Sequence, residues 1–135
     1  MDINVVCCND NSRKDQITKA INILNCVQSY FFYRVVFVDQ DVCEDEEIDW
    51  NLFQENQGKT IDEYTIFISE KPFVDNWFSH EDYKYAIIST YSIPFLSEFF
   101  KDIHERFSGF LLFCSRVCIR GNGRWIVGNR EPPPR

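Results

Sequence analysis

Short apolar runs alternate with polar segments along the first 90 residues, and four of these runs have the composition of strands. They are rich in β-branched and aromatic residues, and polar turns or a proline bound them. The four predicted strands span residues 3–8, 33–38, 64–69 and 85–90. Because nearly every position in each run is apolar, we expect a sheet that is covered on both faces.

Two segments carry apolar residues at helical spacing. The first is predicted over residues 12–29, where the spacing of Ser12 and Asp15 is typical of a capping box. The second is predicted over residues 94–107 and opens with Pro94. Each has a single apolar stripe, so each is expected to pack one face against the sheet.

The order of these elements predicts the fold class. Strand, helix and strand follow one another over about the first forty residues, which indicates two parallel strands joined by a right-handed crossover. We therefore predict an α/β domain with a small, mainly parallel or mixed sheet of four to five strands, flanked by two main helices. The polar segment 39–63 is predicted to be a long surface loop with a helical turn near residues 50–53.

The composition changes sharply near the end of the chain. Residues 1–105 hold eight of the fourteen Lys and Arg and twenty of the twenty-one acidic residues, whereas all six basic residues of 106–135 are Arg. We predict a single domain over residues 1–118 and a basic, disordered tail containing Pro and Gly over residues 119–135. An alternative explanation is that translation has left its original frame somewhere after about Phe107.

The charge and the cysteines limit the partners and the compartment. A formal net charge of −7 argues against nucleic acid and against an anionic membrane surface as partners. The N-terminus has no basic region before an apolar stretch, so we expect no secretory signal. Without such a signal, the six cysteines are predicted to be thiols of a cytoplasmic protein rather than three disulfides.

Three carboxylates follow the first two predicted strands and form one candidate metal site. Asp10 follows the first strand, and Asp39 and Asp41 follow the second. If the two strands are adjacent, the carboxylates could converge on a hard cation such as Mg²⁺. The alternative is that Asp10 belongs to the turn before the helix and that the other two are solvated loop charges.

A second candidate metal site combines an imidazole with two thiols. His104 precedes Cys114 by ten residues, and Cys118 lies four residues further on, so the three could bind Zn²⁺ if the segment folds back. The alternative is a histidine on a helix face and two unrelated thiols. The other histidine, His80, lies in a polar Ser-His-Glu-Asp segment and is expected to be solvated. Phe73, Trp77 and Phe78 are expected either to cover a sheet edge or to form an exposed aromatic patch.

Residues 64–91 resemble a family of uncharacterised bacterial α/β proteins with no assigned activity. The resemblance rests on Ile-Phe-Ile-Ser-Glu-Lys-Pro-Phe-Val-Asp-Asn-Trp-Phe-Ser-His (66–80) and Ala-Ile-Ile-Ser-Thr-Tyr (86–91). Longer members continue into a stretch with a His-Glu pair and cysteines, which His104 and Glu105 would match at its start. The Arg-rich sequence that follows departs from that pattern.

Taken together, these features predict a non-catalytic interaction or remnant domain with a protein partner and no cofactor. Every catalytic motif in the chain is incomplete. The alternative is a metal-dependent hydrolase that uses zinc on the His104, Cys114 and Cys118 set, or Mg²⁺ on the carboxylates.

Overall fold

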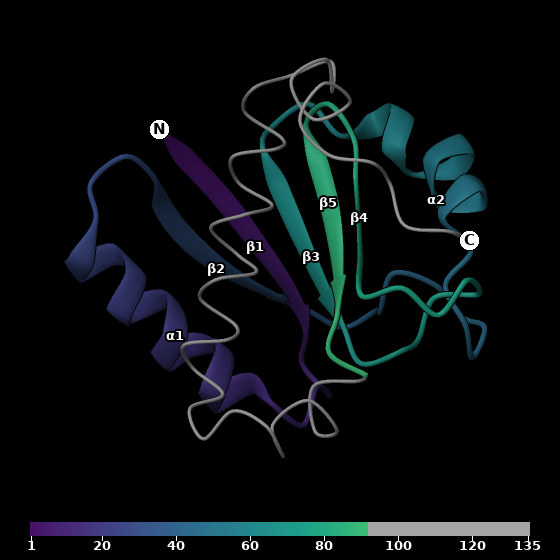
Figure 1. Ribbon diagram of the computed structural model, residues 1–135, viewed down its shortest axis with the longest axis horizontal. Coiled ribbons are helices and arrows are strands. Elements are labelled where there is room, and N and C mark those ends of the chain that lie inside the picture. The colour runs from purple at the N-terminus through teal and green to yellow at the C-terminus, as the bar shows by residue number, and fades with distance from the viewer. Residues whose placement is uncertain (92–135) are drawn as a thin grey trace.

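The computed structural model describes residues 1–91, which form one mixed five-stranded sheet with a helix on each face (Figure 1). The strand order is β2-β1-β3-β5-β4. All neighbours are parallel except β4, which is antiparallel to β5. The strands are β1 (Asp2–Cys8), β2 (Phe32–Val38), β3 (Thr65–Ser69), β4 (Ser79–Glu81) and β5 (Tyr85–Ser89). The predicted fold class is confirmed.

Four of the five strands coincide with the four predicted apolar runs, to within a residue at each end. The pairing of β1 with β2 is parallel, with Val5 opposite Val35, as the strand–helix–strand order predicts. The fifth strand, β4, was not expected, because its three residues are all polar. It forms because its backbone pairs with β5 at the edge of the sheet, and this pairing buries the polar side chains of Ser79 and His80.

Helix α1 (Lys14–Val27) follows β1, but the predicted capping box at its start is wrong. The Ser12 hydroxyl and backbone amide both donate to the carboxylate of Glu70, which follows β3. The side chain of Asn11 accepts instead from the backbone amide of Arg13 at 2.8 Å. A contact between segments distant in sequence has therefore replaced the local cap that the spacing indicated.

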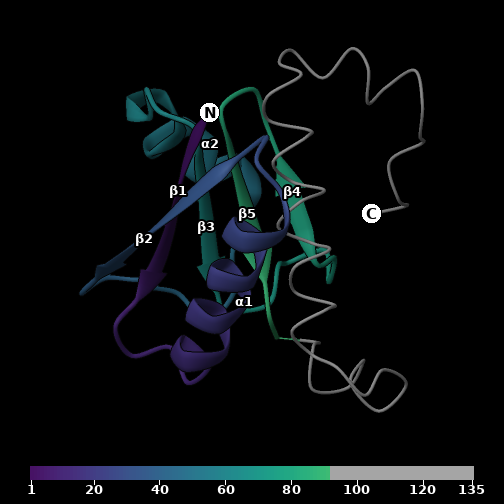
Figure 2. The same ribbon diagram turned by 90° about the vertical axis from the view of Figure 1, so that its left-hand side faces the viewer.

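The two faces of the sheet carry separate apolar clusters. Alternate strand residues, such as Val5, Ile66 and Ile88, pack with Ile17 and Leu24 of α1. The opposite face carries a smaller cluster that includes Phe53 of helix α2 (Trp50–Asn56). Figure 2 shows the two helices on opposite sides of the sheet.

The loop before β3 contains more structure than a single helical turn. Helix α2 covers one face of the sheet and is followed by the short 3-10 helix η1 (Gly58–Thr60). The second main helix, predicted over residues 94–107, lies outside the described residues, as does the tail predicted over residues 119–135. Within residues 1–91, no helix is long and apolar enough to cross a membrane.

Candidate binding pocket

The three candidate carboxylates at the carboxyl ends of β1 and β2 do not form a metal site. Asp39 accepts from the side-chain amide of Asn9 at 2.8 Å, and Asp10 is exposed. Asp41 accepts from its neighbour's amide and from the Ser69 hydroxyl at 3.1 Å. No group of three His, Cys, Asp or Glu side chains within residues 1–91 is arranged to hold a metal ion. Asp39 and Asp41 accept hydrogen bonds from the protein instead, and the three carboxylates do not converge as expected within the described residues.

The second candidate metal set, His104 with Cys114 and Cys118, lies outside the described residues and stays a prediction. Four other cysteines lie within them, and all four are free thiols: Cys7, Cys8, Cys26 and Cys43. Burial raises the pKa of the Cys7 thiol to about 12 and also raises the pKa of the Cys43 thiol. Neither thiol is therefore activated as a nucleophile at neutral pH.

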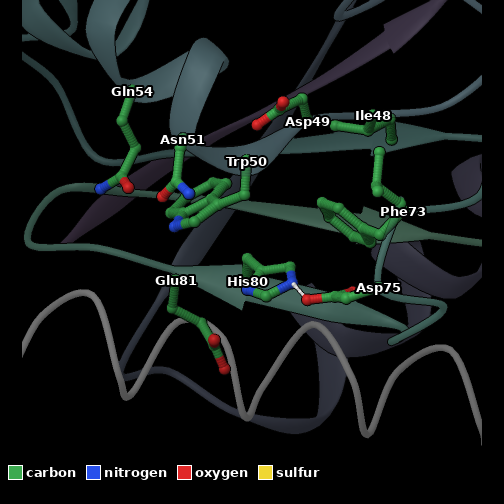
Figure 3. Close-up of a pocket in the computed structure, with 10 residues that line it drawn as sticks. Ile48, Asp49, Trp50, Asn51, Gln54, Phe73, Asp75, His80 and Glu81 are labelled. Atoms are coloured by element: carbon green, nitrogen blue, oxygen red, sulfur yellow. Dashed lines mark hydrogen bonds and ion pairs between the residues drawn. The ribbon is translucent and has the colours of Figure 1, made fainter. Parts of the chain in front are cut away.

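A pocket of about 570 Å³ lies beside α2, between that helix, the turn before β4 and β4 itself (Figure 3). Its described lining comes from residues 48–54, 73–75 and 80–81. The volume falls within the range of roughly 300–1,000 Å³ that is usual for ligand pockets. We call it the α2 pocket.

Two loops meet to form one wall of the α2 pocket. Ile48 pairs with the segment after β3, donating to the Pro72 carbonyl at 2.8 Å and accepting from the Val74 amide at 3.0 Å. Ile48 and Phe73 are each only 1 % exposed and belong to the apolar cluster on this face of the sheet. The wall is therefore fixed by packing and backbone hydrogen bonds rather than by a free loop.

His80 is the most buried polar residue of the α2 pocket, which corrects the prediction that it is solvated. It is 2 % exposed because β4 turns its ring inward, against the face of Trp50 and the edge of Phe73. The ring centroids of these two pairs are 5.4 Å and 4.5 Å apart. The polar sequence around His80 gave no sign of this burial, since the strand pairing that causes it is tertiary.

Asp75 fixes the orientation of the His80 ring. Its Oδ2 lies 2.8 Å from the Nε2 of His80, and its Oδ1 accepts from the backbone amide of Trp77. The turn that carries Asp75 closes through Asn76, whose φ of 63° is a left-handed value that asparagine tolerates better than most residues. The Asp75 side chain is 20 % exposed, so one end of the pair reaches the pocket surface.

The described lining of the α2 pocket is rich in carboxylates. Asp49, Asp75 and Glu81 supply carboxylates, and no Lys or Arg occurs among the described lining residues. Asp49 is also the N-cap of α2, where its Oδ1 accepts from the Leu52 amide at 3.1 Å. A hollow with apolar rings on its floor and carboxylates on its rim is suited to a ligand that carries a positive charge.

The predicted aromatic patch is not present as one exposed surface. Phe73 belongs to the buried cluster beside α2, whereas Trp77 and Phe78 are half-buried, with ring centroids 5.0 Å apart. Sequence reasoning also missed Asp49 and Asp75 as pocket residues. Only Asp49 has a local signal in the sequence, because an Asp at this position is a favourable N-cap for the helix that follows.

No protein-family model, curated protein or solved structure matches this chain. The expected relationship to a family of uncharacterised bacterial α/β proteins therefore stays a prediction.

Proposed function

We propose that this protein is a non-catalytic interaction domain of the bacterial cytoplasm, which binds a basic side chain of a protein partner in the α2 pocket. One observation carries the proposal: a pocket of about 570 Å³ whose described lining brings the exposed Asp49 together with the rings of Trp50 and Phe73. A guanidinium group suits such a site best, because it is planar, stays charged and donates to carboxylates in pairs.

The packing of His80 supports binding rather than catalysis. Its ring is held between Trp50, Phe73 and the Asp75 carboxylate, so it acts as part of the pocket wall. A general base needs to reach a substrate proton, which a ring only 2 % exposed does poorly. The role that fits these contacts is to hold Asp75 and Trp50 in place.

Titration with N-acetyl-arginine methylamide, followed by amide chemical shifts, tests this proposal. We expect shifts at residues 49–51 and at the Trp50 indole, and none with the neutral citrulline analogue. Asp49→Asn keeps an N-cap acceptor but removes the charge, and it should weaken binding by about tenfold, or ~1.4 kcal/mol. Glu55→Gln removes an exposed carboxylate of α2 that does not line the pocket and serves as the matched control.

Equal shifts with arginine and citrulline, or an equal loss in both variants, would contradict the proposal. A metal assay on the purified full chain tests the alternative, a metal-dependent hydrolase. Stoichiometric Zn²⁺ whose removal by a chelator unfolds the protein would favour that alternative over a non-catalytic domain.

A further inference from the structure

Strand β2 lies at one edge of the sheet, and two of its residues have main-chain groups that no other part of the described chain uses. In a parallel pair, every second residue of a strand turns its N–H and C=O toward the neighbouring strand. Phe32 donates to the Met1 carbonyl at 2.8 Å, so the even-numbered residues of β2 bond to β1. The amides and carbonyls of Val35 and Phe37 therefore point outward, and within residues 1–91 no hydrogen bond reaches them.

A side chain of α1 closes the beginning of this edge. The Asn25 amide group donates to the Tyr33 carbonyl and accepts from the Tyr33 backbone amide, each at 2.9 Å. Asn25 thus takes the place of a neighbouring strand at this one residue and blocks pairing there. At the other end, β2 stops at Val38. The part of the edge that remains open is residues 35–37, which we call the open edge.

The open edge carries apolar side chains on both faces of the sheet. Val35 packs against the apolar cluster under α1, and Val36 lies half-buried on the other face. Phe37 is 37 % exposed, and the Lys14 ammonium lies over its ring, 4.8 Å from the centroid. An uncharged strand edge with unused main-chain groups is the kind of surface to which another strand adds.

We propose that the open edge pairs with the open edge of a second copy of this chain, antiparallel about a two-fold axis at Val36. The pattern is self-complementary, because Val35 of one copy and Phe37 of the other exchange both main-chain hydrogen bonds and the symmetry repeats the exchange. Every main-chain group left unused at these two residues then has a partner. The same pairing sets a β-branched side chain opposite an aromatic ring, which is a stabilising cross-strand pair.

The charges at the two ends of β2 also favour a second copy. Arg34, near the beginning of the strand, lies in an exposed ion pair with Asp2 at 3.6 Å. Asp39 directly follows the end of the strand, and no Lys or Arg occurs in residues 35–58. Antiparallel pairing about Val36 brings the beginning of each β2 beside the end of the other. Arg34 of one copy then lies opposite the residue before Asp39 of the second copy, and this complementarity supports the pairing.

The dimer leaves the α2 pocket open in both copies. β2 lies at one edge of the sheet, whereas β4, which contributes to the α2 pocket, lies at the other (Figure 1). Pairing through β2 therefore joins the two sheets into one continuous sheet with a pocket near each end. The proposed function does not depend on this dimer, so a failure of the dimer leaves the proposed function as it is.

Sedimentation equilibrium of the full chain under reducing conditions measures the association, and we expect a monomer–dimer equilibrium. Val36→Lys places two ammonium groups opposite each other and should raise the dissociation constant at least about tenfold. Val74→Lys adds the same charge to an exposed valine beside the α2 pocket, far from the open edge. This control should leave the dissociation constant within about twofold, because the two added charges are distant and screened.

Val36→Cys tests the register and keeps the proposal testable if Val36→Lys does not fold. Residues opposite each other in a non-hydrogen-bonded antiparallel pair have Cα atoms about 4.5 Å apart, within the range of about 4.4–6.8 Å that a disulfide spans. Mild oxidation should therefore link two copies through position 36, which mass spectrometry of the peptides identifies. Arg34→Cys is the control, because position 34 lies opposite Val38 of the second copy and not opposite itself.

Amide hydrogen exchange gives an independent measurement, since the amides of Val35 and Phe37 should become more protected as the protein concentration rises. A chain that stays monomeric up to about 1 mM would overturn the proposal. Equal weakening of a dimer by both Lys variants, or equal cross-linking of both Cys variants, would overturn it as well. If these amides become protected only when another protein is added, the open edge binds a foreign strand and the second copy is wrong.

Discussion

Burial changes the acid–base behaviour of several side chains in this protein. Cys7 is 1 % exposed, and the loss of water around it, followed by the nearby Cys8, Asp41 and Glu70, raises its pKa from the ordinary 9.0 to about 12. Burial raises the pKa of the Tyr85 hydroxyl in the same way. These groups keep their protons in the folded state at pH values where the unfolded chain has lost them.

The free energy of unfolding is therefore expected to fall as the pH rises above about 9. Between the unfolded pKa of the Cys7 thiol, 9.0, and its folded value of about 12, the unfolded state releases a proton that the folded state retains. One such group changes the free energy of unfolding by at most about 1.4 kcal/mol per pH unit.

Urea denaturation between pH 8 and 10.5, under reducing conditions, measures this slope. Cys7→Ala should reduce the slope, whereas Cys26→Ala, which removes an exposed thiol, should not. An unchanged slope in Cys7→Ala would mean that this thiol is not the group responsible.

Gly58 is fixed by a close approach to Tyr85. A Cβ built on Gly58 would overlap the Tyr85 hydroxyl, which donates to Asp82 at 3.1 Å. We expect Gly58→Ala to destabilise the protein by about 1–3 kcal/mol, because the ring has little room to move. Removing the hydroxyl with Tyr85→Phe in the same chain should recover part of that loss. Chemical denaturation of the wild type, the two single variants and the double variant measures the coupling free energy between Gly58 and Tyr85. If the two single losses of stability simply add in the double variant, the proposed contact is contradicted.

The elements of this protein begin and end through contacts that the local sequence only partly determines. Helix α2 starts at a local cap, Asp49, whereas α1 starts where the segments after β1 and β3 meet. Strand β4 exists because β5 offers it an edge.

Asn11→Ala is expected to destabilise the protein by about 1 kcal/mol, since it removes the acceptor for the Arg13 amide at the start of α1. Asp15→Ala should change the stability by no more than about 0.5 kcal/mol, because Asp15 is exposed and does not close the predicted capping box. Chemical denaturation of both variants shows whether Asn11 or Asp15 stabilises the start of α1. A larger loss of stability in Asp15→Ala than in Asn11→Ala would support the predicted capping box.

The whole chain separates its charges along the sequence. Seventeen acidic and seven basic side chains occur within residues 1–91. Three of those acids, Asp49, Asp75 and Glu81, line the α2 pocket. Binding to it should therefore weaken as ionic strength rises.

Truncation after Arg120 is expected to leave the melting temperature nearly unchanged. Residues 121–135 contain three sizeable apolar side chains, Trp125, Ile126 and Val127, whose burial would contribute on the order of 5 kcal/mol. Fixing the backbone of these residues would cost roughly 1–2 kcal/mol each, which is more in total. A drop of more than about 8 °C would show that the segment is a packed part of the fold. The nucleotide sequence around codon 107 separately tests the change of reading frame.

The amino-acid sequence by itself determined the fold class, the four longer strands and helix α1. These elements depend on strong local patterns, such as the apolar runs 3–8 and 64–69 and the helical stripe after residue 12. Such patterns can be read from the sequence because a strand or a helix must bury an apolar face whichever elements it packs against. The position of α2 also followed from a local signal, the helical turn expected near residues 50–53.

Only the tertiary structure decided which polar residues meet. Asp10, Asp39 and Asp41 follow adjacent strands, yet Asp39 accepts from Asn9, Asp41 accepts from Ser69 and Asp10 is exposed. His80 is expected from the sequence to be solvated, yet an edge strand and a turn bring it beside Asp75 and Trp50. The direction of a polar side chain in a turn or at a sheet edge depends on the local path of the backbone. A small change in that path turns the side chain toward solvent or toward the core, and no periodic pattern in the sequence predicts which. The candidate site therefore appeared only when residues 48–54, 73–75 and 80–81 came together in space.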